Sequence, residues 1–139
     1  MAIQQSDVLY TAVATAEGGR DGRVATDDGV LDVVVNPPKE MGGSGAGTNP
    51  EQLFAAGYSA CFQGALGVVA RGQKADLTGS TVTAKVGIGR NEDGFGLLVE
   101  ISASLPNVDA DTARALLEQA HQVCPYSKAT RGDITVTLV

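Results

Sequence analysis

The sequence has few aromatic residues, no tryptophan and no block of basic charge. Its 139 residues include three Phe and three Tyr, and acidic residues outnumber basic ones by 16 to 10, which gives a formal net charge of −6. Nucleic-acid binding takes most of its affinity from Lys and Arg on phosphates, so no nucleic-acid partner is expected. With so few aromatic rings, the core must be built from Val, Leu, Ile and Ala.

Cysteine and histidine are equally scarce, and no uninterrupted apolar run approaches the roughly 18 residues of a membrane span. The two cysteines are Cys61 and Cys124, and the one histidine is His121. Residues 1–6 have neither the basic nor the apolar segment of a signal peptide, so a cytoplasmic protein with no membrane partner is expected. A reducing compartment disfavours a permanent disulfide, which favours a transient or catalytic pair of cysteines.

The length matches one domain of ordinary size over residues 1–139. In its opening third, period-two alternation predicts a strand over Val8–Glu17, a short extended segment over Arg23–Thr26 and a strand over Val30–Val35. Turns rich in glycine and aspartate separate these segments. The pattern predicts an antiparallel meander.

The strongest helix signal follows a flexible loop, Gly42–Gly47. Asn49 can cap a helix, Pro50 fits the first helical position, and Gln52 completes a capping-box spacing. The helix should run from Pro50 to about Gly72. It is apolar and small on nearly all faces, which predicts burial on most sides and suggests obligate dimerisation. A phosphate-binding loop is disfavoured, because the Lys and Ser/Thr pair of such loops is missing.

The second half of the chain predicts a hairpin, a helix and a last strand. Alternation marks the hairpin strands Ser80–Gly89 and Leu97–Leu105. The helix should be capped by Asp109 or Asp111 and end at Cys124, because a proline follows. The apolar positions of the last short strand are Ile134, Val136 and Leu138. This order of elements favours an α+β fold with antiparallel sheets over a doubly wound fold.

Cys61 falls in mid-helix among apolar residues, where an inert buried thiol and a reactive one are both open interpretations. A reactive cysteine needs a stabilised thiolate, since the ordinary cysteine pKa lies above neutral pH. Arg20, in a glycine-rich turn, is a candidate cation for that role, and Glu51 is a candidate carboxylate to hold the arginine. Each also has a simpler explanation: Arg20 as a solvated turn residue, and Glu51 as a first-turn glutamate that the helix dipole favours.

The spacing of Glu51 and Cys61 constrains that idea. Ten positions separate them, which is about 15 Å of rise on one straight helix. One arginine could not touch both groups of the same helix, so either the helix breaks or Glu51 serves the site of a second subunit. Cys124 is far from Cys61 in sequence, so any bridge between the two needs tertiary proximity.

Three other functions compete with redox chemistry. A hydrolase using Cys61 and His121 lacks any motif for an oxyanion hole, and a hydrogen-bonded structural role fits His121 better. A zinc site of Cys61, Cys124 and His121 lacks the paired ligand spacing of such sites, so no metal is expected. A small-molecule binding module with an apolar pocket and inert cysteines is the non-enzymatic alternative.

Four segments closely resemble the organic hydroperoxide resistance branch of the Ohr/OsmC family, and the resemblance covers essentially the whole chain. They are Asn49–Phe62, Val123–Gly132, Leu9–Ala12 and Gly18–Gly22. The resemblance implies an OsmC-like fold, in which antiparallel sheets pack around a long buried central helix. It also implies an intertwined homodimer with two active sites at the subunit interface.

The activity implied by the resemblance is that of a thiol-dependent peroxidase, which reduces organic hydroperoxides to alcohols. Cys61 resembles the peroxidatic thiolate and Cys124 the resolving cysteine, with a Cys61–Cys124 disulfide as the oxidised product. Arg20 resembles the guanidinium that stabilises the thiolate, and Glu51 its carboxylate partner.

The same resemblance implies no resident cofactor and recycling by an external dithiol, namely dihydrolipoamide on lipoylated proteins. The apolar neighbours of the site could receive an alkyl or fatty chain, and we expect these substrate-binding residues to be Phe54, Phe62 and Tyr126. Two small departures from the family pattern, at Gln63 and Asp133, touch none of the four implied catalytic positions.

Overall fold

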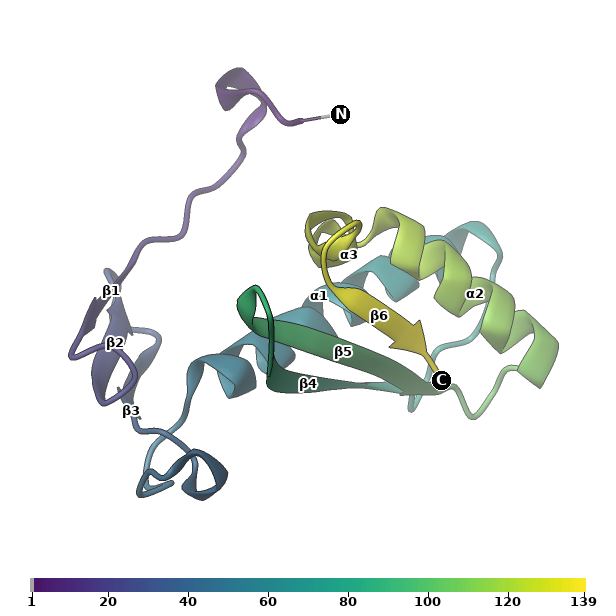
Figure 1. Cartoon of the computed structure of the whole chain (residues 1–139). Coiled ribbons are helices and arrows are strands. Elements are labelled where there is room, and N and C mark those ends of the chain that lie inside the picture. Colours follow the sequence, from purple (N-terminus) through teal and green to yellow (C-terminus); the bar gives the residue numbers. More distant parts are fainter. Residues whose placement is uncertain (1) are drawn as a thin grey trace. The chain divides into compact units, whose positions relative to one another are not determined.

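The computed structural model describes residues 2–139, which group into two compact units (Figure 1). One unit ends at Pro50 and the other spans Glu51–Val139. The assignment of all 139 residues to one family domain stays a prediction.

The N-terminal unit contains a three-stranded antiparallel sheet in the order β1-β2-β3, as the sequence predicts. Its strands and short 3₁₀ helices are η1 (Gln5–Asp7), β1 (Ala14–Glu17), β2 (Gly22–Thr26), β3 (Asp32–Val35) and η2 (Lys39–Met41). The first strand is shorter than the expected Val8–Glu17. Because β2 has only five residues, it pairs with Ala14–Glu17 and leaves residues 8–13 outside the sheet of this unit. Alternation alone cannot extend a strand beyond its partner.

The C-terminal unit contains a long helix, a hairpin, two further helices and a last strand. These are α1 (Pro50–Gly72), β4 (Thr81–Asn91), β5 (Gly94–Ser104), α2 (Ala110–Val123), α3 (Pro125–Thr130) and β6 (Thr135–Leu138). The predicted hairpin is confirmed, and its antiparallel register runs from Thr81 opposite Ser104 to Asn91 opposite Gly94. The predicted start of α1 at Pro50 is also confirmed.

The last strand pairs with β5 in parallel, which a chain of hairpins would not produce. The chain leaves β5, passes through α2 and α3, and returns in the same direction (Figure 1). Parallel neighbours need such a crossover, and two intervening helices supply it. The second sheet is therefore mixed, with the order β4-β5-β6.

The core of this unit lies between α1, α2 and one face of the second sheet. Its wholly buried side chains come from all three layers, and the largest are Tyr58, Phe62, Leu66, Val99, Ile101 and Leu116. Valine and alanine from alternate positions of β4 pack against them. The core is mainly aliphatic, as the scarcity of aromatic residues requires.

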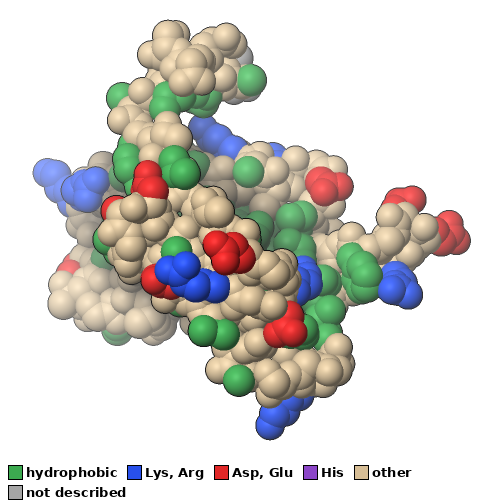
Figure 2. Space-filling model, turned by 90° about the vertical axis from the view of Figure 1, so that its left-hand side faces the viewer, with side chains coloured by type: hydrophobic (Ala, Val, Ile, Leu, Met, Phe, Trp, Pro, Cys, Tyr) green, Lys and Arg blue, Asp and Glu red, His purple; other side chains and the backbone are tan. Residues whose placement is uncertain are grey.

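Helix α1 is buried along one face only within this chain. By length and composition alone it could cross a membrane, but its buried face belongs to the core of the unit. The opposite face is exposed and mostly small or apolar, with Gln52, Ala56, Ala60, Gly64 and Val68 at helical spacing. On the face of the molecule in Figure 2, acidic and basic side chains are interspersed with hydrophobic ones, and no basic patch forms there.

Candidate active site

The two cysteines, far apart in sequence, meet in the C-terminal unit. Cys61 is half-buried on α1, Cys124 is wholly buried after α2, and both are free thiols. The two thiols are hydrogen-bonded to each other, with 3.5 Å between the two Sγ atoms. A disulfide needs these atoms about 2.05 Å apart, so a small local movement suffices to join them.

Cys124 is a single extended residue between two helices. Its N–H closes α2 on the carbonyl of Ala120, while its own carbonyl accepts the N–H of Lys128 in α3. The sequence predicts the end of α2 correctly, but it gives no indication of α3. Pro125 stops one helix and also occupies the first position of the next, and cysteine is not a typical N-cap residue.

The surroundings of Cys61 raise the pKa of its thiol. Burial is the largest cause, and the neighbouring Cys124 raises the pKa further, whereas the backbone N–H of Tyr126 donates to the sulfur and lowers it. Burial penalises the charged form, and a donor to the sulfur favours it. Of these groups, only the Tyr126 N–H promotes the thiolate that nucleophilic chemistry requires.

Three aromatic rings pack together beside the cysteines. The ring centroids of Phe54 and Tyr58 are 6.0 Å apart, those of Phe54 and Tyr126 are 6.1 Å apart, and those of Tyr58 and Tyr126 are 5.7 Å apart. Gly57 makes room for this cluster, because a Cβ atom there would lie 2.7 Å from the Tyr126 hydroxyl. The absence of a side chain at Gly57 therefore lets α3 approach α1 closely.

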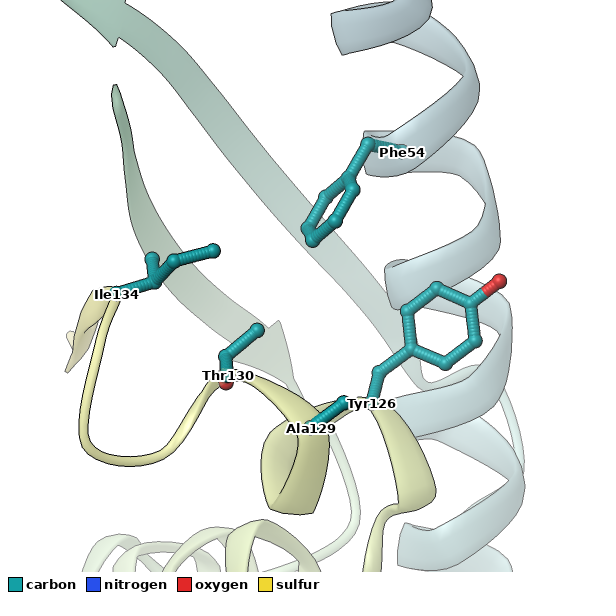
Figure 3. A pocket seen from close by; sticks show the side chains of 5 residues that line it. All are labelled: Phe54, Tyr126, Ala129, Thr130 and Ile134. Carbon is teal, nitrogen blue, oxygen red and sulfur yellow. The ribbon is translucent and has the colours of Figure 1, made fainter. Parts of the chain in front are cut away.

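An apolar cavity of about 370 Å³ opens next to these rings (Figure 3). Its lining residues are Phe54, Tyr126, Ala129, Thr130 and Ile134. The Tyr126 hydroxyl points away from the cavity toward α1, so this residue presents its ring to the space. The cavity can hold an alkyl group, since apolar walls gain free energy by excluding water.

Of the three expected substrate-binding residues, the structure places Phe54 and Tyr126 on the cavity wall. Phe62 is wholly buried in the core instead and does not line the cavity. Sequence reasoning missed Ala129, Thr130 and Ile134. Had α3 been recognised, the helical spacing of residues 126, 129 and 130 would have indicated a shared face.

A cluster of hydrogen-bonded side chains joins α1, α2 and α3. Ser127 Oγ is 2.7 Å from Tyr58 Oη and 2.8 Å from His121 Nδ1. The Tyr58 hydroxyl also lies 3.4 Å from Thr130 Oγ1, which donates to the Ser127 carbonyl. His121 is thus hydrogen-bonded, as expected. Among residues 2–139, no group of three or more His, Cys, Asp or Glu side chains could hold a metal ion.

The pKa of His121 is lowered, chiefly by burial and secondly by the charge of Arg131, which predicts a pH-dependent stability. At a pH just below the ordinary histidine pKa of 6.5, the unfolded chain therefore binds more protons than the folded chain. The free energy of unfolding should therefore decrease as the pH falls below about 6.5 and level off below the folded pKa. Chemical denaturation between about pH 5 and 7.5 measures this slope.

His121→Gln provides the control for that measurement, because glutamine does not titrate. The slope should disappear in the variant, whereas a slope that persists unchanged would contradict the assignment to His121. Carboxyl groups with a lowered pKa, such as Asp109, change the free energy of unfolding chiefly below their ordinary pKa of 3.8, so they do not contribute to the slope between about pH 5 and 7.5.

Arg20 and Glu51 lie in different elements of secondary structure. Arg20 lies in the turn between β1 and β2, where Gly18 and Gly19 have positive φ angles of 79° and 59°. Directly after the turn, a Cβ at Gly22, the first residue of β2, would overlap the carbonyl of Glu17, so this tight geometry requires glycine.

Glu51 lies in the first turn of α1, a single continuous helix that also carries Cys61. A break in the helix between Glu51 and Cys61, which was one of the two alternatives open from the sequence, is therefore excluded. The rise between the two residues stays at about 15 Å.

Comparison with known proteins agrees with this architecture. The OsmC-like protein family matches residues 42–139. An organic hydroperoxide resistance protein of Xanthomonas axonopodis pv. citri is 53% identical over 133 residues, covering 94% of each chain. OhrB of Bacillus subtilis is 45% identical over 132 residues, covering 94% of this chain and 96% of OhrB.

The fold of this chain is also similar to that of solved structures. The crystal structure of Bacillus subtilis OhrB superposes with a TM-score of 0.86 at 44% identity, covering 94% of this chain and 98% of that one. An organic hydroperoxide resistance protein from Legionella pneumophila superposes with a TM-score of 0.90 at 47% identity, covering 94% and 96%. The chain belongs to the organic hydroperoxide resistance branch of the OsmC-like family.

Proposed function

We propose that this protein is a cysteine-based peroxidase that reduces organic hydroperoxides to alcohols. The observation that carries the proposal is the pair of free thiols, with sulfurs 3.5 Å apart, in a unit whose helices α1 and α3 also line an apolar cavity. Relatives named for organic hydroperoxide resistance, at 53% and 45% identity, support the same class of substrate.

The reaction begins at Cys61. Its thiolate attacks one peroxide oxygen, the O–O bond breaks, and the other oxygen leaves with a proton as an alcohol. Cys61 is then a sulfenic acid. The Cys124 sulfur displaces the sulfenic oxygen, which leaves as water with the thiol proton, and a Cys61–Cys124 disulfide remains.

The apolar cavity determines which peroxide reacts best. Phe54 and Tyr126 would contact the alkyl or fatty chain of the substrate, and hydrogen peroxide has no such group to bury. We therefore assign organic hydroperoxides, rather than hydrogen peroxide, as the preferred substrates.

Arg20 and Glu51 complete the site from a second subunit of an intertwined homodimer. The guanidinium would stabilise the Cys61 thiolate and the charge that develops on the leaving oxygen, while Glu51 orients it. Two observations support a second subunit. Glu51 lies about 15 Å along the helix from the Cys61 of its own chain, and the exposed face of α1 offers small residues for close contact.

No resident cofactor is needed, because an external dithiol can reduce the disulfide by exchange. We assign this role to dihydrolipoamide on a lipoylated protein, in the cytoplasm. Consumption of dihydrolipoamide that depends on hydroperoxide, compared across several dithiols, identifies the reductant.

Titration with a hydroperoxide tests the function directly. One equivalent of cumene hydroperoxide or tert-butyl hydroperoxide per subunit should remove both free thiols and leave an intramolecular disulfide, measured by thiol counting and intact mass. An unchanged thiol count would contradict the peroxidase and favour a binding module with inert cysteines. Ester cleavage without loss of thiols would instead indicate a hydrolase.

A further inference from the structure

One buried hydroxyl joins all three helices of the C-terminal unit. Ser127 on α3 is wholly buried, and its Oγ is hydrogen-bonded to Tyr58 of α1 and His121 of α2. Each of these residues is three positions from a cysteine on the same helix or at its end: Tyr58 precedes Cys61, His121 precedes Cys124, and Ser127 follows it. Tyr58 and Cys61 share a face of α1, because residues three apart on a helix do so, and His121 and Ser127 flank Cys124 from the two helices that it joins.

The position of Cys124 depends on how the helices around it are held. It is a single extended residue, and its backbone is hydrogen-bonded to α2 on one side and to α3 on the other, so it moves with those helices. The three-way contact at Ser127 fixes α3 against α1 and α2 at once. Buried polar groups of this kind are expensive to leave unpaired, so the cluster resists any arrangement that separates the helices.

We propose that Tyr58, Ser127 and His121 are positioning residues that hold the Cys124 thiol against Cys61 and thereby set the rate of disulfide closure. This inference rests on the proposed peroxidase reaction. In the affected step, the Cys124 sulfur attacks the Cys61 sulfenic sulfur, the S–O bond breaks, and water leaves with the Cys124 proton. None of the three side chains donates or accepts a proton in that step. The burial that lowers the pKa of His121 favours its neutral form in the cluster.

Closure competes with a second oxidation. A sulfenic acid that waits for Cys124 can react with another hydroperoxide to give a sulfinic acid and a second alcohol. Both routes start from the same Cys61 sulfenic acid, so a general change in its reactivity affects them together. The ratio of sulfinic acid to disulfide therefore reports the placement of Cys124.

Ser127→Ala removes the central hydroxyl and tests the inference. Closure should slow about tenfold, which corresponds to about 1.4 kcal/mol and matches the loss of a buried hydrogen bond. Oxidation of Cys61 should change by less than about threefold, since the Ser127 hydroxyl takes no part in that step. Rapid quenching after a single turnover, followed by mass spectrometry, separates sulfenic acid, disulfide and sulfinic acid.

Ser59→Ala is the matched control. It removes a hydroxyl from α1 two positions before Cys61, where the side chain donates to the carbonyl of Ala56, and should leave both rates unchanged. Tyr58→Phe keeps the ring in the aromatic cluster and loses only the hydroxyl, and it should also slow closure. It therefore tests the inference independently of how well Ser127→Ala folds.

Three results would overturn the inference: unchanged closure in Ser127→Ala and Tyr58→Phe, equal slowing of both steps, or the same effect in Ser59→Ala. Failure of the unmodified protein to form any disulfide would instead contradict the proposed function. The two failures are thus distinguishable.

Discussion

Replacement of Cys61 by serine should lower hydroperoxide consumption about a thousandfold or more, because a serine hydroxyl is not ionised at neutral pH and is a poor nucleophile. Replacement of Cys124 should have a different effect. Cys124→Ser leaves the attacking thiol in place, so Cys61 should still be oxidised once and then accumulate as sulfenic or sulfinic acid.

Intact mass after addition of hydroperoxide distinguishes the two variants. We expect no added oxygen in Cys61→Ser and one or two added oxygens in Cys124→Ser. The asymmetry follows from the structure, in which Cys61 is half-buried and Cys124 wholly buried, so only the first is accessible to substrate. Equal residual turnover in the two variants would contradict the roles assigned to the pair.

Replacement of Arg20 by alanine is expected to raise the pKa of Cys61 and slow its oxidation about tenfold or more at neutral pH. The structure already shows burial raising the pKa of this thiol. A thiolate site in such surroundings needs a compensating cation. Ultraviolet absorbance of the thiolate, followed against pH, gives the pKa directly, and no rise in Arg20→Ala would remove this residue from the site.

Arg23→Ala is the control for that measurement. Arg23 is three residues further on in the same unit and forms an exposed ion pair with Asp32, with 2.6 Å between the charged atoms. Such a surface pair contributes little to stability. Its loss should leave the Cys61 pKa unchanged.

Mixed dimers reveal which subunit supplies the arginine. A dimer of one Cys61→Ser chain and one Arg20→Ala chain should regain about half of the normal activity if Arg20 acts on the partner's cysteine, because one of its two sites is then intact. If Arg20 acts within its own chain, neither site is complete and the mixed dimer should have only about half of the activity of Arg20→Ala alone.

Local signals in the sequence were sufficient for much of the fold. Pro50 marked the start of α1, and the proline after Cys124 marked the end of α2. These signals work because the residues involved restrict the backbone within a few positions. Family membership was also readable from sequence, since the resemblance spans the whole chain and both cysteine segments.

The rest depended on contacts between distant segments. The same proline that ended α2 began α3, and only the packing of α3 on α1 gives that short helix its role. The direction of β6 followed from the crossover before it, and the burial of Phe62 from the face that α1 turns toward the core. Periodicity shows that a residue lies on some face, but it does not show what that face meets.

The sequence by itself determined where the main helices begin and end, because that property resides in residue type and local backbone preference, and it singled out the two cysteines as candidate reactive groups. Only the tertiary structure decided that Cys61 and Cys124 meet at 3.5 Å, that Phe54 and Tyr126 line one apolar cavity, and that Ser127 connects three helices. Each of these joins α1 to the segment after α2. Such contacts form when the whole core packs, and no local signal specifies their distance or their partners.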